Sequence, residues 1–322
     1  MGEKDITQKN FEAYNDVAAD IINGSLFNGE QVISPDSLID AQLYSQYKAD
    51  DSKIHEQERD VAKYCIDKNC NIRLAFIGFE NQTVIDQDMP LRLYGYDGAV
   101  YRDELNQDKV EIDATGAKRK IRNKRYPVIT IVLYFGKKPW KSPLSLYGSL
   151  DIPKEFMPFV NDYKMNLIDV PRLTREQVNK YQGDFQIIAD YFVQLNTTKT
   201  YKPSSKPIQH TDSMLKLLAV LTNDKRYESV LHSENQEEVG NMCEVLDCLI
   251  AEGEARGEAR GEARGEARGE ARGEARGEKR GALNKTLEIL RLIMTKNKWS
   301  KKQAMEFIGI PESEFNKYAA LL

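Results

Sequence analysis

Cysteine, histidine and tryptophan are scarce in this sequence. Its 322 residues include four Cys, three His and two Trp. Four cysteines in so long a chain do not form the framework of a disulfide-stapled domain. Cys65 and Cys70 have the same spacing as Cys243 and Cys248, but structural zinc sites use closer pairs. We therefore expect free, mostly buried thiols rather than a zinc site.

Long apolar runs are also missing. No run approaches the roughly 20 apolar residues that a helix needs to cross a bilayer. The first residues, MGEKD, are polar and charged, unlike a secretory signal. The sequence therefore predicts a cytoplasmic protein that does not use a membrane.

An excess of positive charge is absent as well. Lys plus Arg number 46 and Asp plus Glu number 50, which gives a net charge of −4. A nucleic-acid-binding protein of this composition would have to concentrate its basic residues in a local patch.

Residues 74–82, LAFIGFENQ, form the most informative stretch. Their apolar side chains would fall on both faces of a strand, as in the central strand of a sheet that helices cover. The run ends in Glu80 and two amides. Asp60 begins the preceding extended segment, and residues 67–69 read as a hairpin turn. Pairing of the two segments would bring Asp60 and Glu80 to one edge of the sheet, where a hard divalent cation would relieve their repulsion.

Asp60 followed by Glu80-Asn81-Gln82 resembles the active site of the PD-(D/E)XK nuclease superfamily. More narrowly, it resembles the recombination-promoting nuclease / putative transposase family, over roughly residues 11–250. Further short words occur in the family's order: ADIIN at 19–23, DMPLR at 88–92, YD at 96–97, PVIT at 127–130 and FVNDYK at 159–164. The resemblance implies an α/β fold with a PD-(D/E)XK nuclease-like core of αβββαβ type, in which helices flank a central mixed sheet.

The resemblance also implies a function, that of a Mg²⁺- or Mn²⁺-dependent DNA endonuclease of the recombination-promoting or transposase-associated type. Asp60 and Glu80 would be carboxylate ligands of the metal, and the backbone carbonyl of Asn81 a third ligand. The superfamily's usual third residue is a Lys, whereas this chain has Gln82. A Gln side chain can orient a water molecule, but it cannot carry positive charge. Asp20 is either an accessory acid at the metal or part of a solvated helix face.

Two alternatives stay open. Asp60 and Glu80 could form structural ion pairs with Arg59 or Arg92 instead of a metal site. At the level of function, the alternative is a catalytically inactive DNA-binding or assembly protein on the same fold.

Apolar spacing predicts the other elements of the core. Helical spacing from Phe11 to Leu26 predicts one helix over residues 11–28, and a second helix is expected after Gln82, up to about Asn106. Residues 31–55 read as a mixed connection. The clearest strands are the β-branched run at 127–135 and the shorter run at 165–170.

A run of basic side chains lies within residues 107–126. Such a run is either a solvated loop or a clamp for DNA phosphates, because backbone contacts dominate DNA affinity. The candidate phosphate-binding residues are Lys118, Arg119, Lys120, Arg122, Lys124 and Arg125.

An unusual repeat follows the helical second half of the chain. The quartet Gly-Glu-Ala-Arg occurs six times from Gly253 to Arg276. With a period of four, each quartet turns about 40° further round a helix, so no face stays fixed. Glu and Arg never take the favourable i,i+4 spacing. The repeat is either an exposed, frayed helical spacer, which we favour, or a rod that pairs copies of the chain through its Glu and Arg columns.

The expected organisation has four parts. They are a nuclease-like core at 1–170, a helical cap at 171–251, the repeat spacer at 252–281 and a C-terminal helical hairpin at 282–322. Ser300 is the expected N-cap of a helix over residues 301–307. The C-terminal helices are either a hairpin for contacts between protein chains, which we favour, or a DNA-reading helix-turn-helix. Together with the repeat, they are the candidate route to a homo-oligomer.

Overall fold

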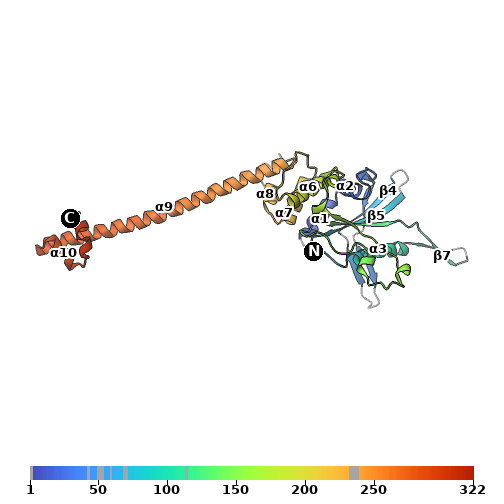
Figure 1. Cartoon of the computed structure of the whole chain (residues 1–322), viewed down its shortest axis with the longest axis horizontal. Coiled ribbons are helices and arrows are strands. Elements are labelled where there is room, and N and C mark those ends of the chain that lie inside the picture. Colours follow the sequence, from blue (N-terminus) through green and yellow to red (C-terminus); the bar gives the residue numbers. More distant parts are fainter. Residues whose placement is uncertain are drawn as a thin grey trace. The chain divides into compact units, whose positions relative to one another are not determined.

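The computed structural model describes residues 3–41, 44–48, 54–58, 60–67, 72–112, 115–231 and 239–322. Contacts within the chain divide it into two compact units, Met1–Leu249 and Ile250–Leu322, which are described one at a time (Figure 1). Within the described ranges, no helix combines the length and the apolar character needed to span a bilayer.

A five-stranded mixed sheet lies at the centre of the first unit, with the strand order β1-β4-β5-β8-β9. The strands are β1 (Leu38–Asp40), β4 (Val61–Asp67), β5 (Ile72–Gln82), β8 (Val128–Tyr134) and β9 (Asn166–Asp169). Strand β5 is antiparallel to β4 and parallel to β8. The run at 74–82 is thus in the middle strand, as predicted. The expected hairpin is confirmed, although Lys68 and Asn69 of its turn lie outside the described residues.

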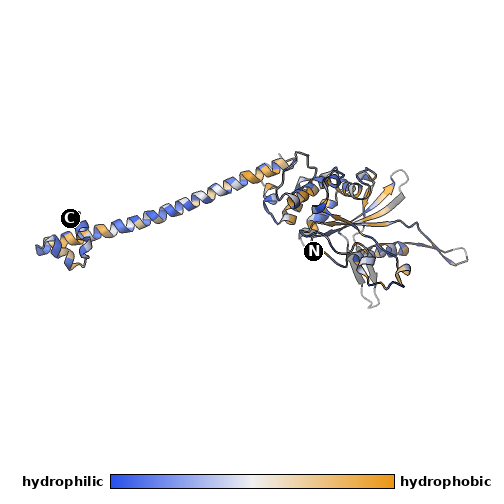
Figure 2. Cartoon of the chain, in the orientation of Figure 1, coloured by the Kyte–Doolittle hydropathy of each residue, from blue (hydrophilic) through white to orange (hydrophobic). Residues whose placement is uncertain are grey.

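Helices cover both faces of this sheet. On one face, α2 (Asn15–Leu26), α6 (Asp184–Thr197) and α7 (Thr211–Thr222) share a core with alternate residues of β5 and β8. On the other face, Met89 and Leu93 of α3 (Met89–Asn106) pack with Val132 of β8. The alternation arises because successive side chains of a strand point to opposite faces. An α/β fold with a central mixed sheet flanked by helices is therefore confirmed, and Figure 2 shows the apolar strands between the helices.

The helix expected over residues 11–28 is confirmed only from Asn15 to Leu26. The chain forms α1 (Glu3–Glu12) and α2, with a break between them. The buried Lys63 of β4 accounts for the break, because its Nζ donates hydrogen bonds to the carbonyl oxygen of Ala13 (2.6 Å) and to Oδ1 of Asn15 (2.9 Å). A buried ammonium group needs such acceptors, and it takes a carbonyl that a continuous helix would use internally.

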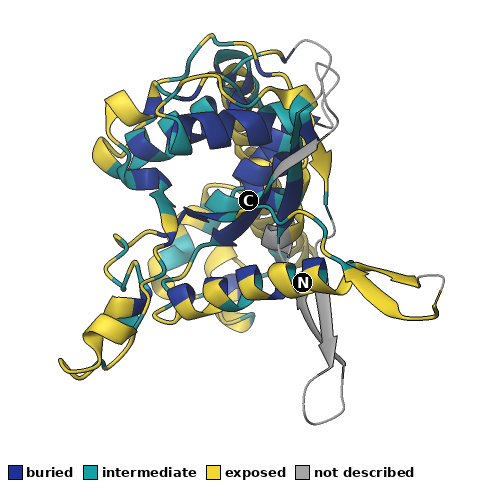
Figure 3. Cartoon of the chain, turned by 90° about the vertical axis from the view of Figure 1, so that its right-hand side faces the viewer, coloured by how far each residue is buried: buried dark blue, intermediate teal, exposed yellow. Residues whose placement is uncertain are grey.

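Two small hairpins lie outside the main sheet. Strand β2 (Tyr44–Lys48) pairs with β3 (Ile54–Glu58) in the region expected as a mixed connection. Strand β6 (Lys109–Ile112) pairs with β7 (Lys118–Ile121). The prediction of a solvated loop within residues 107–126 is therefore wrong, because part of this range forms a hairpin. Figure 3 shows the exposed surface of the β6–β7 hairpin, which projects from the body of the unit.

Short helices complete the first unit. They are α4 (Leu146–Ser149), α5 (Arg175–Val178) and α8 (Arg226–Leu231), with 3₁₀ turns at η1 (Pro35–Ser37), η2 (Met157–Phe159) and η3 (Val170–Arg172). The core on the α2 face includes side chains from the sheet and from the helices after residue 171, so the expected nuclease-like part and the expected cap contribute to one core.

One long helix, α9 (Met242–Asn297), contains the whole repeat. The residues from 253 to 282 are exposed. The chain turns after α9 into α10 (Lys301–Phe307), η5 (Glu312–Glu314) and α11 (Phe315–Ala319), which pack around Leu290, Ala304 and Met305. Ser300 is the N-cap of α10, as predicted, because its hydroxyl accepts a hydrogen bond from the Gln303 backbone.

Candidate active site

The pairing of β4 with β5 brings two acidic residues to the same edge of the sheet. Val61 lies opposite Phe79, so Asp60, one residue earlier, comes beside Glu80, one residue later. The backbone N–H of Asn81 donates a 2.7 Å hydrogen bond to Oδ2 of Asp60. This bond holds the Asp60 carboxylate against the end of β5.

Helix α1 contributes residues that the sequence analysis missed. Buried Gln8 donates from Nε2 to Oδ1 of Asn81 (3.2 Å), and Asn81 donates from Nδ2 to Oε2 of Glu12 (2.8 Å). The side chain of Asn81 is therefore a clamp between β5 and α1. The sequence signal for this clamp was the i,i+4 spacing of Gln8 and Glu12, which places both side chains on one helix face. A solvated helix face shows the same spacing, so the spacing did not identify the clamp.

Glu12 brings a third carboxyl group to the edge. Burial raises the pKa of Glu12 well above its ordinary value, and the negative charges of Asp60 and Glu80 raise it further, whereas the hydrogen bond from Asn81 lowers it. Glu12 therefore lies close enough to Asp60 and Glu80 for their charges to act on it. Carboxyl groups this close either retain protons or attract cations.

Lys9 of α1 is one cation at this edge. Its Nζ lies 3.7 Å from Oδ1 of Asp60, and the two side chains are 14% and 20% exposed. Arg92, which the sequence left open as a structural partner of the acids, instead donates to Oδ2 of Asp86 at 2.6 Å. The other such candidate, Arg59, lies outside the described residues.

Asp20 has a different place. Its Oδ1 accepts a hydrogen bond from the backbone of Gln182 (2.5 Å) and its Oδ2 one from the backbone of Gly183 (2.8 Å). Gly183 is the N-cap of α6, where a negative charge is favourable. Burial raises the pKa of Asp20, and these two hydrogen bonds lower it. The structure thus places Asp20 at a helix terminus and does not bring it together with Asp60 and Glu80.

The donor atoms at the edge suit a hard divalent cation. Asp60, Glu80 and the carbonyl of Asn81 offer oxygen ligands, and Mg²⁺ is usually held by one or two carboxylates with several waters. Within the described part of the chain, no three His, Cys, Asp or Glu side chains are grouped so that they could hold a metal ion by themselves. Cys65 is a buried free thiol, and Cys70 lies outside the described residues.

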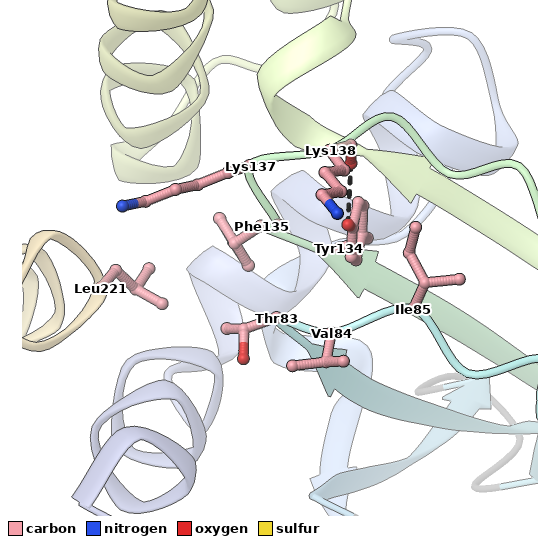
Figure 4. A pocket seen from close by; sticks show the side chains of 9 residues that line it. Thr83, Val84, Ile85, Tyr134, Phe135, Lys137, Lys138 and Leu221 are labelled. Carbon is pink, nitrogen blue, oxygen red and sulfur yellow. Dashed lines mark hydrogen bonds between the residues drawn. The ribbon is translucent and has the colours of Figure 1, made fainter.

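A cavity of about 520 Å³ opens where β5 and β8 end (Figure 4). The backbone N–H of Phe135 donates to the carbonyl of Gln82 (2.9 Å) and joins the two strands at this point. Thr83, the residue after Gln82, lines the cavity. Lys137 and Lys138 contribute to its lining, and the hydroxyl of Tyr134 donates to the carbonyl of Lys138 (2.8 Å). In α/β sheets, ligands commonly bind outside the carboxyl ends of the strands.

The six basic residues around β7 are not equivalent. Nη2 of Arg125 donates to both carboxylate oxygens of Asp108 (2.6 Å each), and Nζ of Lys120 lies 3.5 Å from the same carboxylate. These contacts tie the base of the hairpin and hold the pKa of Asp108 at about 2, below its ordinary value. The other four, all exposed, are Lys118, Arg119, Arg122 and Lys124.

Comparison with models of known protein families gives a match for part of the chain. Residues 64–200 match the model of a family described as "Putative transposase, YhgA-like". The matched range includes Glu80, Asn81 and Gln82 and begins four residues after Asp60. No curated protein and no solved structure matches the chain. Residues 64–200 of this chain are therefore similar to a family of putative transposases of the YhgA-like type.

Proposed function

We propose that this protein is a metal-dependent endonuclease that hydrolyses phosphodiester bonds in DNA, on a PD-(D/E)XK nuclease-like core. The observation that carries the proposal is the hydrogen bond from the Asn81 backbone to Asp60. It fixes one acid beside another at the end of a central strand, in the arrangement that the family resemblance assigns to the metal site. The family match supports DNA as the substrate.

Asp60 and Glu80 would hold Mg²⁺ or Mn²⁺, with the backbone carbonyl of Asn81 as a further oxygen ligand. When bound, the cation would neutralise charge on the phosphate and favour attack by water. Gln82 would orient that water by hydrogen bonding. In the reaction, a water oxygen forms a bond to phosphorus as the bond to a sugar oxygen breaks. The leaving oxygen takes up a proton, and the attacking water loses one to solvent.

The exposed positive charges of the first unit support binding of the DNA backbone. Lys137 and Lys138 lie at the cavity beyond Gln82, and the β6–β7 hairpin exposes Lys118 and Arg119. Contacts of this kind position a duplex without reading its sequence. They supply locally the positive charge that the whole chain, at −4, lacks.

The test is cleavage of supercoiled plasmid with Mg²⁺ or Mn²⁺, using Asp60→Asn and Glu80→Gln. Both substitutions preserve side-chain size and remove a negative charge, and we expect each to abolish nicking without unfolding the chain. Asp212→Asn is the matched control, because Asp212 is an exposed acid paired with Lys216 on α7. Equal behaviour of the wild type and all three variants over a range of metals would exclude the nuclease.

The second candidate is a DNA-binding or assembly protein that keeps the fold without catalysis. The exposed basic hairpin and the exposed repeat are the features that favour it. It predicts that the wild type retards plasmid in a gel at every metal concentration and leaves the plasmid intact.

A further inference from the structure

The candidate active site contains three carboxyl groups and, at Gln82, an amide where the superfamily has a lysine. A phosphodiester that approaches Glu12, Asp60 and Glu80 adds further negative charge. Preorganised positive charge aimed at the reacting group is usually a large contribution to the rate of such reactions. Gln82 cannot provide it, so any positive charge beyond that of a bound cation has to come from another residue.

Helix α1 offers a lysine at the right place. Lys9 lies between Gln8 and Glu12, and the hydrogen bonds of these two residues to Asn81 hold α1 against the end of β5. Its Nζ is 3.7 Å from Oδ1 of Asp60. This distance is too long for a good hydrogen bond, so the contact is mainly electrostatic.

The two carboxylate oxygens of Asp60 have different neighbours. Oδ2 accepts the hydrogen bond from the backbone of Asn81, whereas Oδ1 faces Lys9. A divalent cation bound at Oδ1 would lie next to the ammonium group and displace it from the carboxylate. A phosphate oxygen that binds such a cation would then be within reach of Lys9 as well.

We propose that Lys9 is the catalytic cation of this site, and that it supplies from α1 the positive charge absent at position 82. The inference rests on the proposed nuclease function. Lys9 acts as a fixed charge that contacts the scissile phosphate, and it neither gains nor loses a proton in the step. A purely structural ion pair between Lys9 and Asp60 is the competing interpretation.

The test compares Lys9→Met, Lys9→Arg and the double variant Lys9→Met/Gln82→Lys. We expect Lys9→Met to lower the single-turnover cleavage rate about 100-fold, the size of effect seen when one stabilising donor is removed. Lys9→Arg should keep the rate within about tenfold of the wild type, since it keeps the charge. The double variant should regain at least about tenfold over Lys9→Met, because it restores a lysine at the other position.

Mn²⁺ binding without DNA provides a readout other than activity. Removing a positive charge beside Asp60 should leave the affinity of Lys9→Met for Mn²⁺ unchanged or make it about threefold tighter. Lys216→Met, which removes a lysine paired with Asp212, is the matched control. It should change neither the cleavage rate nor the affinity for Mn²⁺. A variant that lost both cleavage and Mn²⁺ binding, with no recovery in Lys9→Arg or in the double variant, would overturn the proposal in favour of the structural role.

The failure of this inference can be told apart from failure of the nuclease proposal. Cleavage by Lys9→Met at the wild-type rate, while Asp60→Asn is inactive, overturns the role of Lys9 alone. A wild-type chain that cleaves no DNA with any metal overturns both.

Discussion

Asn81 holds Asp60 through its backbone and Glu12 through its side chain. One residue of the central strand therefore positions an acid of β4 and the helix α1. We expect Asn81→Ala to keep the backbone hydrogen bond to Asp60 and to lose the side-chain hydrogen bond to Glu12. The loss leaves buried polar groups of Gln8 and Glu12 without their partner, which should cost about 1–3 kcal/mol of unfolding free energy.

Urea unfolding followed by circular dichroism measures this cost. Asn166→Ala is a suitable control, because the side chain of the exposed Asn166 also donates a hydrogen bond, in this case to the carbonyl of Thr130. Equal losses in the two variants would mean that Asn81 does not clamp α1.

Glu12 should make stability depend on pH. Its pKa is raised in the folded chain, so the folded state binds this proton more tightly than the unfolded state, where the pKa is about 4.3. The stabilisation is full below the unfolded pKa and is lost as the pH rises through the folded pKa. Glu12→Gln keeps a hydrogen-bond acceptor and removes the charge, so its stability relative to the wild type should rise between pH 4 and pH 8 in EDTA. A difference independent of pH would contradict this.

The exposed basic residues of the hairpin should set the salt dependence of DNA binding. We expect Arg119→Ala and Arg122→Ala each to weaken binding and to reduce the slope of log affinity against log salt by about 0.9. Arg125→Ala should change the slope less, because Arg125 is bound to Asp108. Fluorescence anisotropy at several NaCl concentrations decides this, and equal slopes for the three variants would show that the Asp108 contact does not withhold Arg125 from DNA.

The glycines of the repeat provide a test between spacer and rod. A Cβ added at Gly257, Gly265 or Gly273 would meet no atom within 4 Å. If the repeat is a spacer, Gly→Ala at these positions should stabilise the helix by about 0.5–1 kcal/mol per site. The helix content should rise and the oligomeric state should stay unchanged. In a rod that needs close approach, the same changes should dissociate the oligomer, as light scattering would show. Deleting residues 257–276 should likewise leave cleavage by a monomer intact if the repeat is a spacer.

The sequence predicted strands β4, β5, β8 and β9 of the sheet and the position of Asp60 beside Glu80, but it did not predict β1. Strands β5 and β8 are long apolar runs, and the hairpin that includes β4 and β5 fixes the register. Helix α1 was out of reach, because its site residues are polar and their partner, Asn81, lies about seventy residues away. The break after α1 depends on Lys63, a residue that no local pattern connects to Ala13. The β6–β7 strands were missed because charge, and not apolar alternation, dominates them.

The exposed quartets of α9 meet no other part of the described chain through their glycines. Each internal quartet also has the same neighbours before and after it. Gaining or losing one quartet would therefore leave every remaining local environment as it was, while the helix changed in length by about 6 Å. Copy number in this segment can consequently drift during evolution without disturbing the hydrophobic cores of the two units.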